Sequence, residues 1–318
     1  MQASPCPACG RPSLVPWRPA TASDPQLAGR AGFSLDRCAE CGSAATRGDA
    51  PDRAAMYEGG TYAPARGTAA RLIGPVRRLA ERDRTRFTAD LPRGSRVLEV
   101  GAGDGKLVAA MRAAGLEARG IDPSPAACAA AAALGVEVAN AGVDEAEVEP
   151  GSEDAVVLWH ALEHLDDPAG ALARIRSWTR PDGAIVVAVP NLASWQAAIG
   201  GDRWFHQDVP RHRTHFTPAG ITALLERGGY RVERIRHLLL EQNPLGMWQT
   251  LLNRLTAQRD FGFRALKRDL DPAARGAARD AAVTAIAGPL LVPVALLAEL
   301  GAGLARRGGS IVVEARLA

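Results

Sequence analysis

The stretch VLEVGAGDG at residues 97–105 decides the fold that we expect for this chain. A short apolar and β-branched run leads into three glycines spaced GxGxG, and residues 106–114 then carry a helical pattern. Strand, glycine turn and helix in this order open an α/β sheet, which binds ligands at the carboxyl end of the strand. Because glycines let the backbone come close to a ligand, the stretch predicts a site for a nucleotide-like cofactor.

Two details of the turn argue against a dinucleotide. The spacing is GxGxG where dinucleotide-binding turns have GxGxxG, and an acid, Glu99, precedes the turn within the strand. A carboxylate repels a pyrophosphate but tolerates a cation such as the ammonium and sulfonium of S-adenosylmethionine. A second acid, Asp122, follows the strand expected at 117–121, where it can accept hydrogen bonds from both hydroxyls of a ribose.

The same alternation continues along the chain. We expect further strands at 136–138, 154–159, 184–189, 231–239 and 310–315, a helix at 169–178 and a turn at 181–183. With VLEVGAGDG, GIDPS at 120–124 and LWHALEHLDDP at 158–168, this order resembles the class I S-adenosylmethionine-dependent methyltransferases of the type 11/12 kind. The resemblance covers residues 69–238 and 309–318 and implies an α/β, Rossmann-like sheet of seven strands with helices on both faces.

The resemblance also implies cofactor contacts. The glycine turn would hold the methionine part of S-adenosylmethionine, Asp122 the ribose, and Asn140, in the loop after the third strand, would flank the adenine. Many relatives carry Asp at the position of Asn140, so another residue of that loop is an alternative. The candidate cofactor-binding residues are Glu99, Gly101, Gly103, Gly105, Asp122, Asn140 and Trp159.

Three polar residues follow the fourth strand, at the rim where the methyl group would emerge. His160, Glu163 and His164 are spaced i, i+3 and i+4, which puts them on one side of a helical turn. The pattern is similar to the ExxEH of ubiquinone-type O-methyltransferases and small-RNA 3′-end methyltransferases, where a divalent ion such as Mg²⁺ orients the hydroxyl; His160 replaces the first acid. The alternative is that Glu163-His164 is only a structural element of the superfamily.

A second group of candidates lies after the fifth strand, in the region that usually covers the acceptor. A histidine, with an ordinary pKa near ~6.5, can take the proton of a hydroxyl. We favour His215 as this base, with His160 and His212 as further catalytic candidates, and His212 or His215 can also complete a metal site. The alternative is that they are surface histidines beside the N-cap of a helix that starts at Thr217-Pro218.

Two CxxC pairs predict a zinc-ribbon-like module at residues 1–48. Cys6 and Cys9 are separated by 28 residues from Cys38 and Cys41, which suits four thiolates around one tetrahedral, structural Zn²⁺. A redox dithiol is the competing interpretation. The fifth cysteine, Cys128, lies in an alanine-rich run typical of a buried helix.

Two further segments complete the expected organisation. Residues 49–68 have the composition of a linker, and residues 69–91 predict a helix with a basic face. Residues 239–308 predict a helical apolar insertion before the last strand, with a charge-free run at 281–298. Three interpretations stay open for this run: a membrane span, which Pro289 and Pro293 disfavour; a hairpin on a bilayer surface or over an apolar acceptor; and a core or self-association helix.

The composition is that of an ordinary globular enzyme. Of 318 residues, 47% are hydrophobic and 23% charged, and a net charge of only +3 does not indicate a nucleic-acid partner. The first residues lack a signal-peptide pattern, so we expect a cytoplasmic protein, with peripheral contact at the inner face of the membrane and homo-oligomers left open.

The leading hypothesis is an enzyme that methylates a hydroxyl of a small or lipid- or glycosyl-linked acceptor. A sugar C-methyltransferase and an RNA methyltransferase that docks through the zinc module are alternatives. A non-enzymatic scaffold that binds S-adenosylmethionine and docks on a membrane or a partner is the third.

Overall fold

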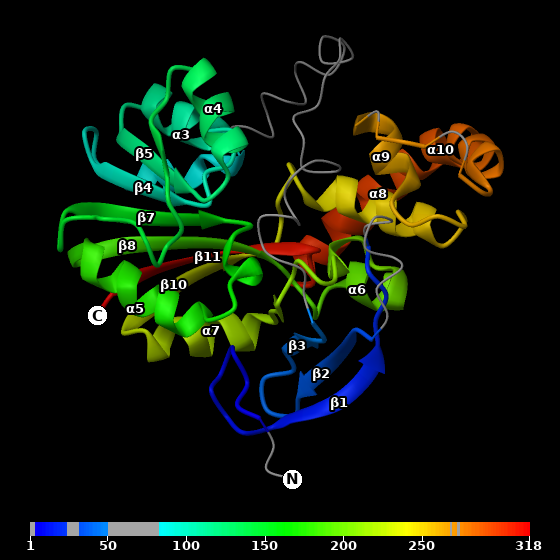
Figure 1. Cartoon of the computed structure of the whole chain (residues 1–318), viewed down its shortest axis with the longest axis horizontal. Coiled ribbons are helices and arrows are strands. Elements are labelled where there is room, and N and C mark those ends of the chain that lie inside the picture. Colours follow the sequence, from blue (N-terminus) through cyan, green and yellow to red (C-terminus); the bar gives the residue numbers. More distant parts are fainter. Residues whose placement is uncertain (1–3, 24–31, 50–82, 268, 272–273) are drawn as a thin grey trace.

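Figure 1 shows a computed structural model of the chain, which describes residues 4–23, 32–49, 83–267, 269–271 and 274–318. Nearly all of the predicted linker at 49–68, and the first part of the predicted helix at 69–91, lie outside the described residues. The part of that helix that is described, η4 (Arg86–Asp90), is a 3₁₀ helix that buries Phe87.

A seven-stranded sheet forms the centre of the molecule, with the order β10-β11-β8-β7-β4-β5-β6. Its strands are β4 (Arg96–Val100), β5 (Glu117–Asp122), β6 (Val138–Asn140), β7 (Glu153–Trp159), β8 (Thr179–Pro190), β10 (Tyr230–Arg236) and β11 (Ser310–Leu317). The strands from β4 to β8 are parallel, whereas β11 runs antiparallel to both of its neighbours. The expected α/β, Rossmann-like fold is confirmed. Since β4 pairs with both β5 and β7, the order reverses at β4, where such sheets bind their ligands.

Helices cover both faces of this sheet (Figure 1). They are α3 (Lys106–Ala113) and α4 (Pro125–Ala133) on one face, and α5 (Pro168–Trp178) and α7 (Pro218–Arg227) on the other. The strand alternation sends neighbours to opposite cores: Val97 packs with the α3 side chains and Leu98 with those of α5 and α7. Each fully buried aliphatic side chain of this kind stabilises the fold by about 1.5–3 kcal/mol.

Three local predictions were wrong. The sixth strand, expected at 231–239, ends at Arg236. The third strand starts at Val138, two residues later than expected, because Gly135 and Val136 end helix α4: Gly135 has φ 72° and the Val136 amide donates to the Ala131 carbonyl. The turn expected at 181–183 is instead a bulge within β8, where Asp182 has φ 62° and the pairing with β7 changes register.

The N-terminal residues form a second, four-stranded sheet. It consists of β1 (Leu14–Pro19), β2 (Ser34–Cys38), β3 (Ala44–Arg47) and, from far along the chain, β9 (Thr214–His215). Strand β9 pairs antiparallel with β3 through Ala44–His215 and Ala45–Thr214. The N-terminal sheet is therefore built in part from the segment that follows the fifth strand of the large sheet.

The remaining helices lie beyond the carboxyl ends of the parallel strands (Figure 1). They are α6 (Trp195–Gly200), α8 (Asn243–Asn253), α9 (Phe261–Lys267) and α10 (Ala277–Leu304), with the 3₁₀ turns η5 (Leu162–His164), η6 (Gly201–Arg203) and η7 (Phe205–Gln207) between strands. Helices α8 to α10 stand between β10 and β11, where the sequence indicates an insertion.

Candidate functional site

The glycine turn after β4 has the backbone that its three glycines permit. Gly101, Gly103 and Gly105 have φ values of 75°, 54° and 74°, in the region that favours glycine. A Cβ on Gly101 would lie 2.7 Å from the Cβ of Ala161, whereas a Cβ on Gly103 would meet nothing within 4 Å. Gly101 thus allows close packing, and Gly103 exposes its backbone to open space.

Asp122, at the end of β5, is oriented by this turn. Its Oδ2 accepts from the Gly103 amide at 2.8 Å and its Oδ1 from the Ser124 amide at 2.9 Å. Asn140 lies on the neighbouring strand and its side-chain amide donates to the Asp122 carbonyl at 3.1 Å. The structure therefore gathers Gly103, Asp122 and Asn140 at one edge, while the predicted contacts with ribose and adenine stay predictions.

Glu99 lies beneath the turn, 1% exposed. Its Oε1 is 4.0 Å from an Arg84 guanidinium nitrogen, and its Oε2 has no hydrogen-bond partner among the described residues. Burial raises the pKa of this carboxyl to about 8, against the opposing effect of Arg84. Arg84, which the sequence analysis missed, also stands over the ring of Trp159 at 5.5 Å and 3.4 Å from Glu241.

His160 directly follows β7 and has a φ of 54°, an unusual backbone for a residue with a side chain. Its Nδ1 is 3.2 Å from Oε1 of Glu163, and its buried Nε2 has no hydrogen-bond partner in the described part of the chain. Burial, helped by the charge of Arg84, lowers the pKa of His160 to about 4, so the imidazole is neutral at pH 7. The predicted helical turn does not include His160, because η5 begins only at Leu162.

Glu163, His164 and His212 form a second cluster, with one potential ligand atom from each lying within 4.8 Å of the others. The sequence spacing indicated His160 as the third member and left His212 or His215 as further ligands; in the structure the third member is His212. His164 Nδ1 lies 3.2 Å from the Arg211 carbonyl and His212 Nδ1 lies 2.9 Å from the His206 carbonyl. Because a carbonyl only accepts, each Nδ1 carries the proton, which leaves a lone pair on each Nε2.

His215 sits in β9 against the N-terminal sheet. The Thr46 hydroxyl donates to the His212 carbonyl at 2.6 Å, so its oxygen accepts from His215 Nε2 at 3.0 Å. Burial lowers the pKa of His215 to about 4. His215, the base favoured from the sequence, therefore contacts the N-terminal sheet with the nitrogen that carries its proton.

His206 is a neighbour of the site that the sequence analysis did not select. Its ring stacks on that of His160 with centroids 6.2 Å apart, and the ring of His212 lies 4.6 Å from that of His164. Five of the six histidines of the chain thus gather here, namely His160, His164, His206, His212 and His215. The one available signal was the crowding of histidines at 206–215 in a chain with few of them.

The four N-terminal cysteines also meet. Their sulfurs lie within 4.8 Å of one another, with Cys6–Cys41 at 3.7 Å and Cys9–Cys38 at 3.6 Å. Four sulfurs placed at ~2.3 Å around a tetrahedral zinc would be about 3.8 Å apart, so the spacing fits this ion. Gly10 and Gly42, which follow the second cysteine of each pair, have φ values of 75° and 73°, as such turns need.

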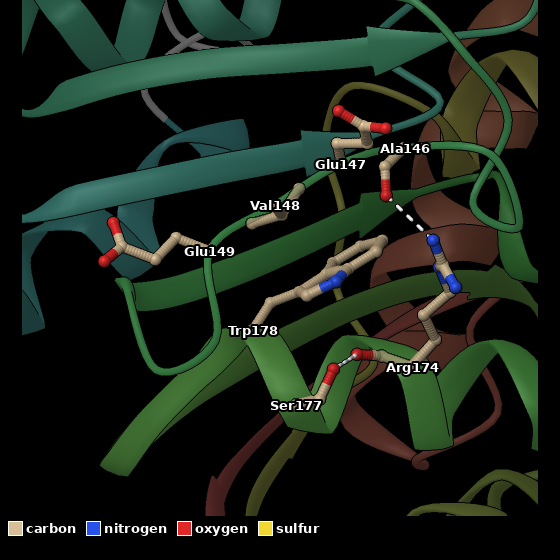
Figure 2. A pocket seen from close by; sticks show the side chains of 7 residues that line it. All are labelled: Ala146, Glu147, Val148, Glu149, Arg174, Ser177 and Trp178. Atoms are coloured by element: carbon tan, nitrogen blue, oxygen red, sulfur yellow. Dashed lines mark hydrogen bonds between the residues drawn. The ribbon is translucent and has the colours of Figure 1, made fainter.

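A shallow hollow of about 490 Å³ lies elsewhere, between the connection from β6 to β7 and helix α5 (Figure 2). Arg174 crosses it and donates to the Ala146 carbonyl at 2.9 Å, next to the ring of Trp178. None of the predicted site residues lines this hollow, so it is separate from the candidate site.

Comparison with known proteins agrees with this arrangement. A family model described as a methyltransferase domain matches residues 73–235, just over half of the chain. The ubiquinone biosynthesis O-methyltransferase of Xanthomonas axonopodis pv. citri (strain 306) is 29% identical over 163 residues, which are 47% of this chain and 68% of that protein. Its counterpart from Ralstonia nicotianae is 30% identical over 166 residues, 48% of this chain and 68% of the relative.

Among solved structures, an S-adenosylmethionine-dependent methyltransferase from Archaeoglobus fulgidus is similar at a TM-score of 0.48. Its sequence identity is 17%, and the match covers 77% of this chain and 97% of that one.

Proposed function

The chain belongs to the class I S-adenosylmethionine-dependent methyltransferases, and we propose that it methylates a hydroxyl group of a small or lipid-linked acceptor. The observation that carries this proposal is the pair His160–Glu163 at the end of β7, where Glu163 contacts Nδ1 of a neutral imidazole whose Nε2 has no hydrogen-bond partner among the described residues. Relatives named as O-methyltransferases support transfer to an oxygen atom.

The glycine turn and Asp122 are the proposed holders of the cofactor. When bound, S-adenosylmethionine supplies an electrophilic methyl group on a sulfonium. Gly103 offers a backbone that can approach the cofactor closely, Asp122 would accept from the ribose hydroxyls, and buried Glu99 would stabilise the cationic methionine end. Trp159 and Asn140 flank these groups on the adjoining strands and complete the proposed set.

His160 is the proposed general base. It receives the hydroxyl proton on Nε2 as the acceptor oxygen bonds to the methyl carbon and the carbon–sulfur bond breaks, with its electron pair going to sulfur. Glu163 orients the ring through Nδ1 and stabilises the imidazolium that forms. His215, whose Nε2 donates to Thr46, is given no role in this step.

We also propose that Glu163, His164 and His212 can hold a divalent ion. The residues fit such an ion, since the ligand atoms of the three side chains lie within 4.8 Å of one another and Glu163 Oε2 is buried without a hydrogen-bond partner among the described residues. Such an ion would lower the pKa of an acceptor hydroxyl and orient it. Turnover that is equal in excess chelator and in magnesium, with the cysteine-bound zinc retained, would dismiss this ion. The four cysteines are proposed to bind structural Zn²⁺.

The function is tested with purified full-length protein, methyl-labelled S-adenosylmethionine, and lipid, sugar and RNA fractions of a cell extract. We expect label in the lipid fraction and, by NMR, on oxygen. Changing His160→Asn should lower kcat by about 100-fold, because a positioned base contributes on this order, and should leave the dissociation constant of the cofactor unchanged.

His237→Asn is the matched control, since His237 lies apart from the five clustered histidines, and it should keep full activity. Label on carbon would indicate a sugar C-methyltransferase, and label in RNA that is lost with Cys38→Ser would indicate an RNA methyltransferase. Cofactor binding without turnover on any fraction would support a scaffold. Each of these outcomes contradicts the proposed O-methylation of a small or lipid-linked acceptor.

A further inference from the structure

Helix α10 (Ala277–Leu304) buries its two acidic side chains and exposes many of its apolar ones. Its two acids, Asp280 and Glu299, are 0% and 1% exposed, while Ile286, Leu290 and Leu297 are 71%, 69% and 71% exposed. In the described part of the chain it is the one helix long and apolar enough to cross a membrane, with a mean hydropathy of 2.2 over 18 residues, of which 11% are buried. A core helix would show the opposite orientation.

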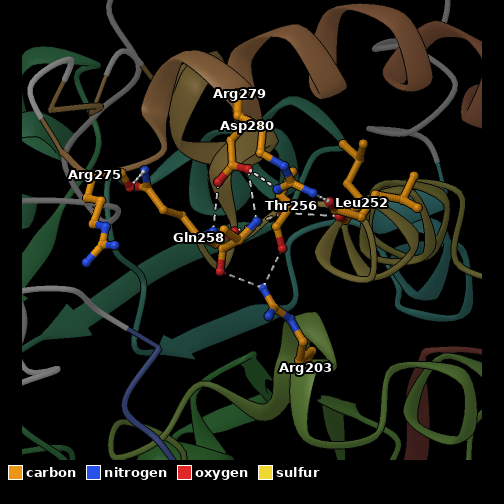
Figure 3. A network of polar contacts seen from close by, with 9 residues as sticks. Arg203, Leu252, Thr256, Gln258, Arg275, Arg279 and Asp280 are labelled. Carbon is orange, nitrogen blue, oxygen red and sulfur yellow. Dashed lines mark hydrogen bonds and ion pairs between the residues drawn. The ribbon is translucent and has the colours of Figure 1, made fainter.

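Both ends of α10 are held to the protein by these acids. Asp280 accepts from the amides of Ala257 and Gln258 at 2.9 and 2.8 Å, in the network of Figure 3. Glu299 accepts from the side-chain amide of Gln196 at 2.7 Å and from the Gly309 amide at 3.2 Å.

The middle of α10 is held as well, because the Trp248 indole donates to the Gly288 carbonyl at 2.8 Å. A helix fixed to one body at its start, its middle and its end cannot leave that body to span a bilayer. The outward side of α10 is therefore a surface of the folded protein.

We define the apolar face of α10 as Ile286, Leu290, Val292, Val294, Leu296, Leu297, Leu300 and Leu304, which are between 46% and 77% exposed. An ideal helix turns about 100° per residue, so Val292 and Val294 bound an arc of about 200° that contains the other six. No charged residue lies on this arc between 281 and 298. The face is wide as well as apolar.

We propose that the apolar face of α10 docks on the surface of an anionic lipid bilayer. Exposed arginines stand at both ends of the face: Arg275 and Arg279 near its start, Arg306 and Arg307 just after its end. Since Arg279 pairs with Asp280 and Arg307 donates to the Ala193 carbonyl, we expect Arg275 and Arg306 to reach the lipid phosphates first. Interfacial helices bind anionic membranes in this way: their apolar side chains enter the boundary between headgroups and acyl chains, and flanking arginines contact the lipid phosphates.

Charge and width both argue against a second copy of the chain as the occupant. A symmetric antiparallel pair of α10 helices would bring the arginines at 275 and 279 against those at 306 and 307, and a parallel pair would bring each against its own copy, so like charges meet in either case. A helix pair also covers only a narrow seam, which would leave Val292 or Val294 in water.

The test is flotation of the full-length protein with vesicles of phosphatidylcholine alone or with about one third phosphatidylglycerol. We expect binding to the anionic vesicles that weakens at high salt, and binding to phosphatidylcholine weaker by about tenfold or more. The double variant Leu290→Gln/Leu297→Gln should lose binding by about tenfold or more, and Arg306→Gln/Arg307→Gln should weaken binding to the anionic vesicles alone.

Leu134→Gln is the matched control, because Leu134 is 52% exposed on the cofactor-binding domain, and it should bind as the unchanged protein does. Cofactor affinity and circular dichroism establish that each variant folds. Absence of binding to both vesicles, equal binding by the α10 variants, or a dimer in sedimentation that dissociates in the double leucine variant would overturn the proposal. Vesicle binding needs neither cofactor nor turnover, so its outcome is independent of the proposed reaction.

Discussion

The carboxyl of Glu99 carries a proton near neutral pH, because burial raises its pKa to about 8. A cationic cofactor beside Glu99 would favour the ionised carboxylate, so cofactor binding should release this proton. The affinity for S-adenosylmethionine should therefore rise between pH 6 and pH 7.5, by as much as about tenfold per pH unit, since one proton linked to binding gives this slope. Calorimetric titration in two buffers of different ionisation enthalpy measures the proton released.

Glu99→Gln, which cannot ionise, should bind the cofactor with an affinity that changes little over this range. Its affinity should approach that of the unchanged protein at pH 6 and fall about tenfold below it at pH 7.5. Equal pH profiles for the two proteins would show that Glu99 does not contact the cationic end of the cofactor.

At the same scale, the sequence could indicate which residues form the site but not how they pair. The glycine turn and Asp122 are neighbours in the fold because the carboxyl ends of parallel strands meet, which spacing alone predicts. The pairing of His164 with His212 depends on a loop 48 residues away, and the left-handed backbone of His160 depends on packing around Gly101 and Ala161. Neither has a local signal.

At the scale of elements, strands were predicted well wherever an apolar run ends at a glycine, as β4 does, or at a polar residue, as β5 and β7 do. The start of β6 was predicted too early, because the apolar run that suggests a strand from Val136 overlaps the cap that ends α4 at Gly135 and Val136. Strand β9 has two residues and exists only through its pairing with β3, so no window of sequence contains the information that forms it.

The contact between β3 and the histidines gives a prediction for Thr46. The Thr46 hydroxyl joins the His212 carbonyl to His215, so Thr46→Val leaves two buried polar groups without their partner, which costs about 1–3 kcal/mol. We expect kcat to fall about tenfold as His212 shifts, with the KM for the cofactor unchanged. Steady-state kinetics measure both parameters, and Thr46→Ser, which keeps the hydroxyl, should restore kcat. Full activity of Thr46→Val would show that β3 does not position the cluster.

At the scale of the whole molecule, the N-terminal sheet and the side of the large sheet that carries the histidines are joined by common elements. Strand β9 completes the N-terminal sheet, the Thr217 hydroxyl at the start of α7 donates to the Cys41 carbonyl at 2.6 Å, and Arg227 donates to the Ala8 carbonyl at 3.2 Å. Both cysteine pairs therefore contact the two ends of α7, the helix that directly follows β9 and its His215. We therefore expect zinc binding by the four cysteines to stabilise the segment that holds His212 and His215, because a structural zinc contributes its binding energy to folding.

Removing the zinc should consequently slow turnover and leave the affinity for the cofactor nearly unchanged. With Cys38→Ser we expect loss of about one zinc per chain, a Tm lower by more than about 5 °C and turnover at least about tenfold slower. Affinity for S-adenosylmethionine should stay within about twofold, because the described neighbours of Gly101 and Gly105 in the turn are Ala161, Val136 and Ala131 and include no cysteine. Metal analysis, calorimetry and titration of the cofactor measure the three quantities, with Cys128→Ser, outside the group, as the control that keeps its zinc. A zinc-free protein with unchanged turnover would mean that the N-terminal sheet folds beside the catalytic face without ordering it.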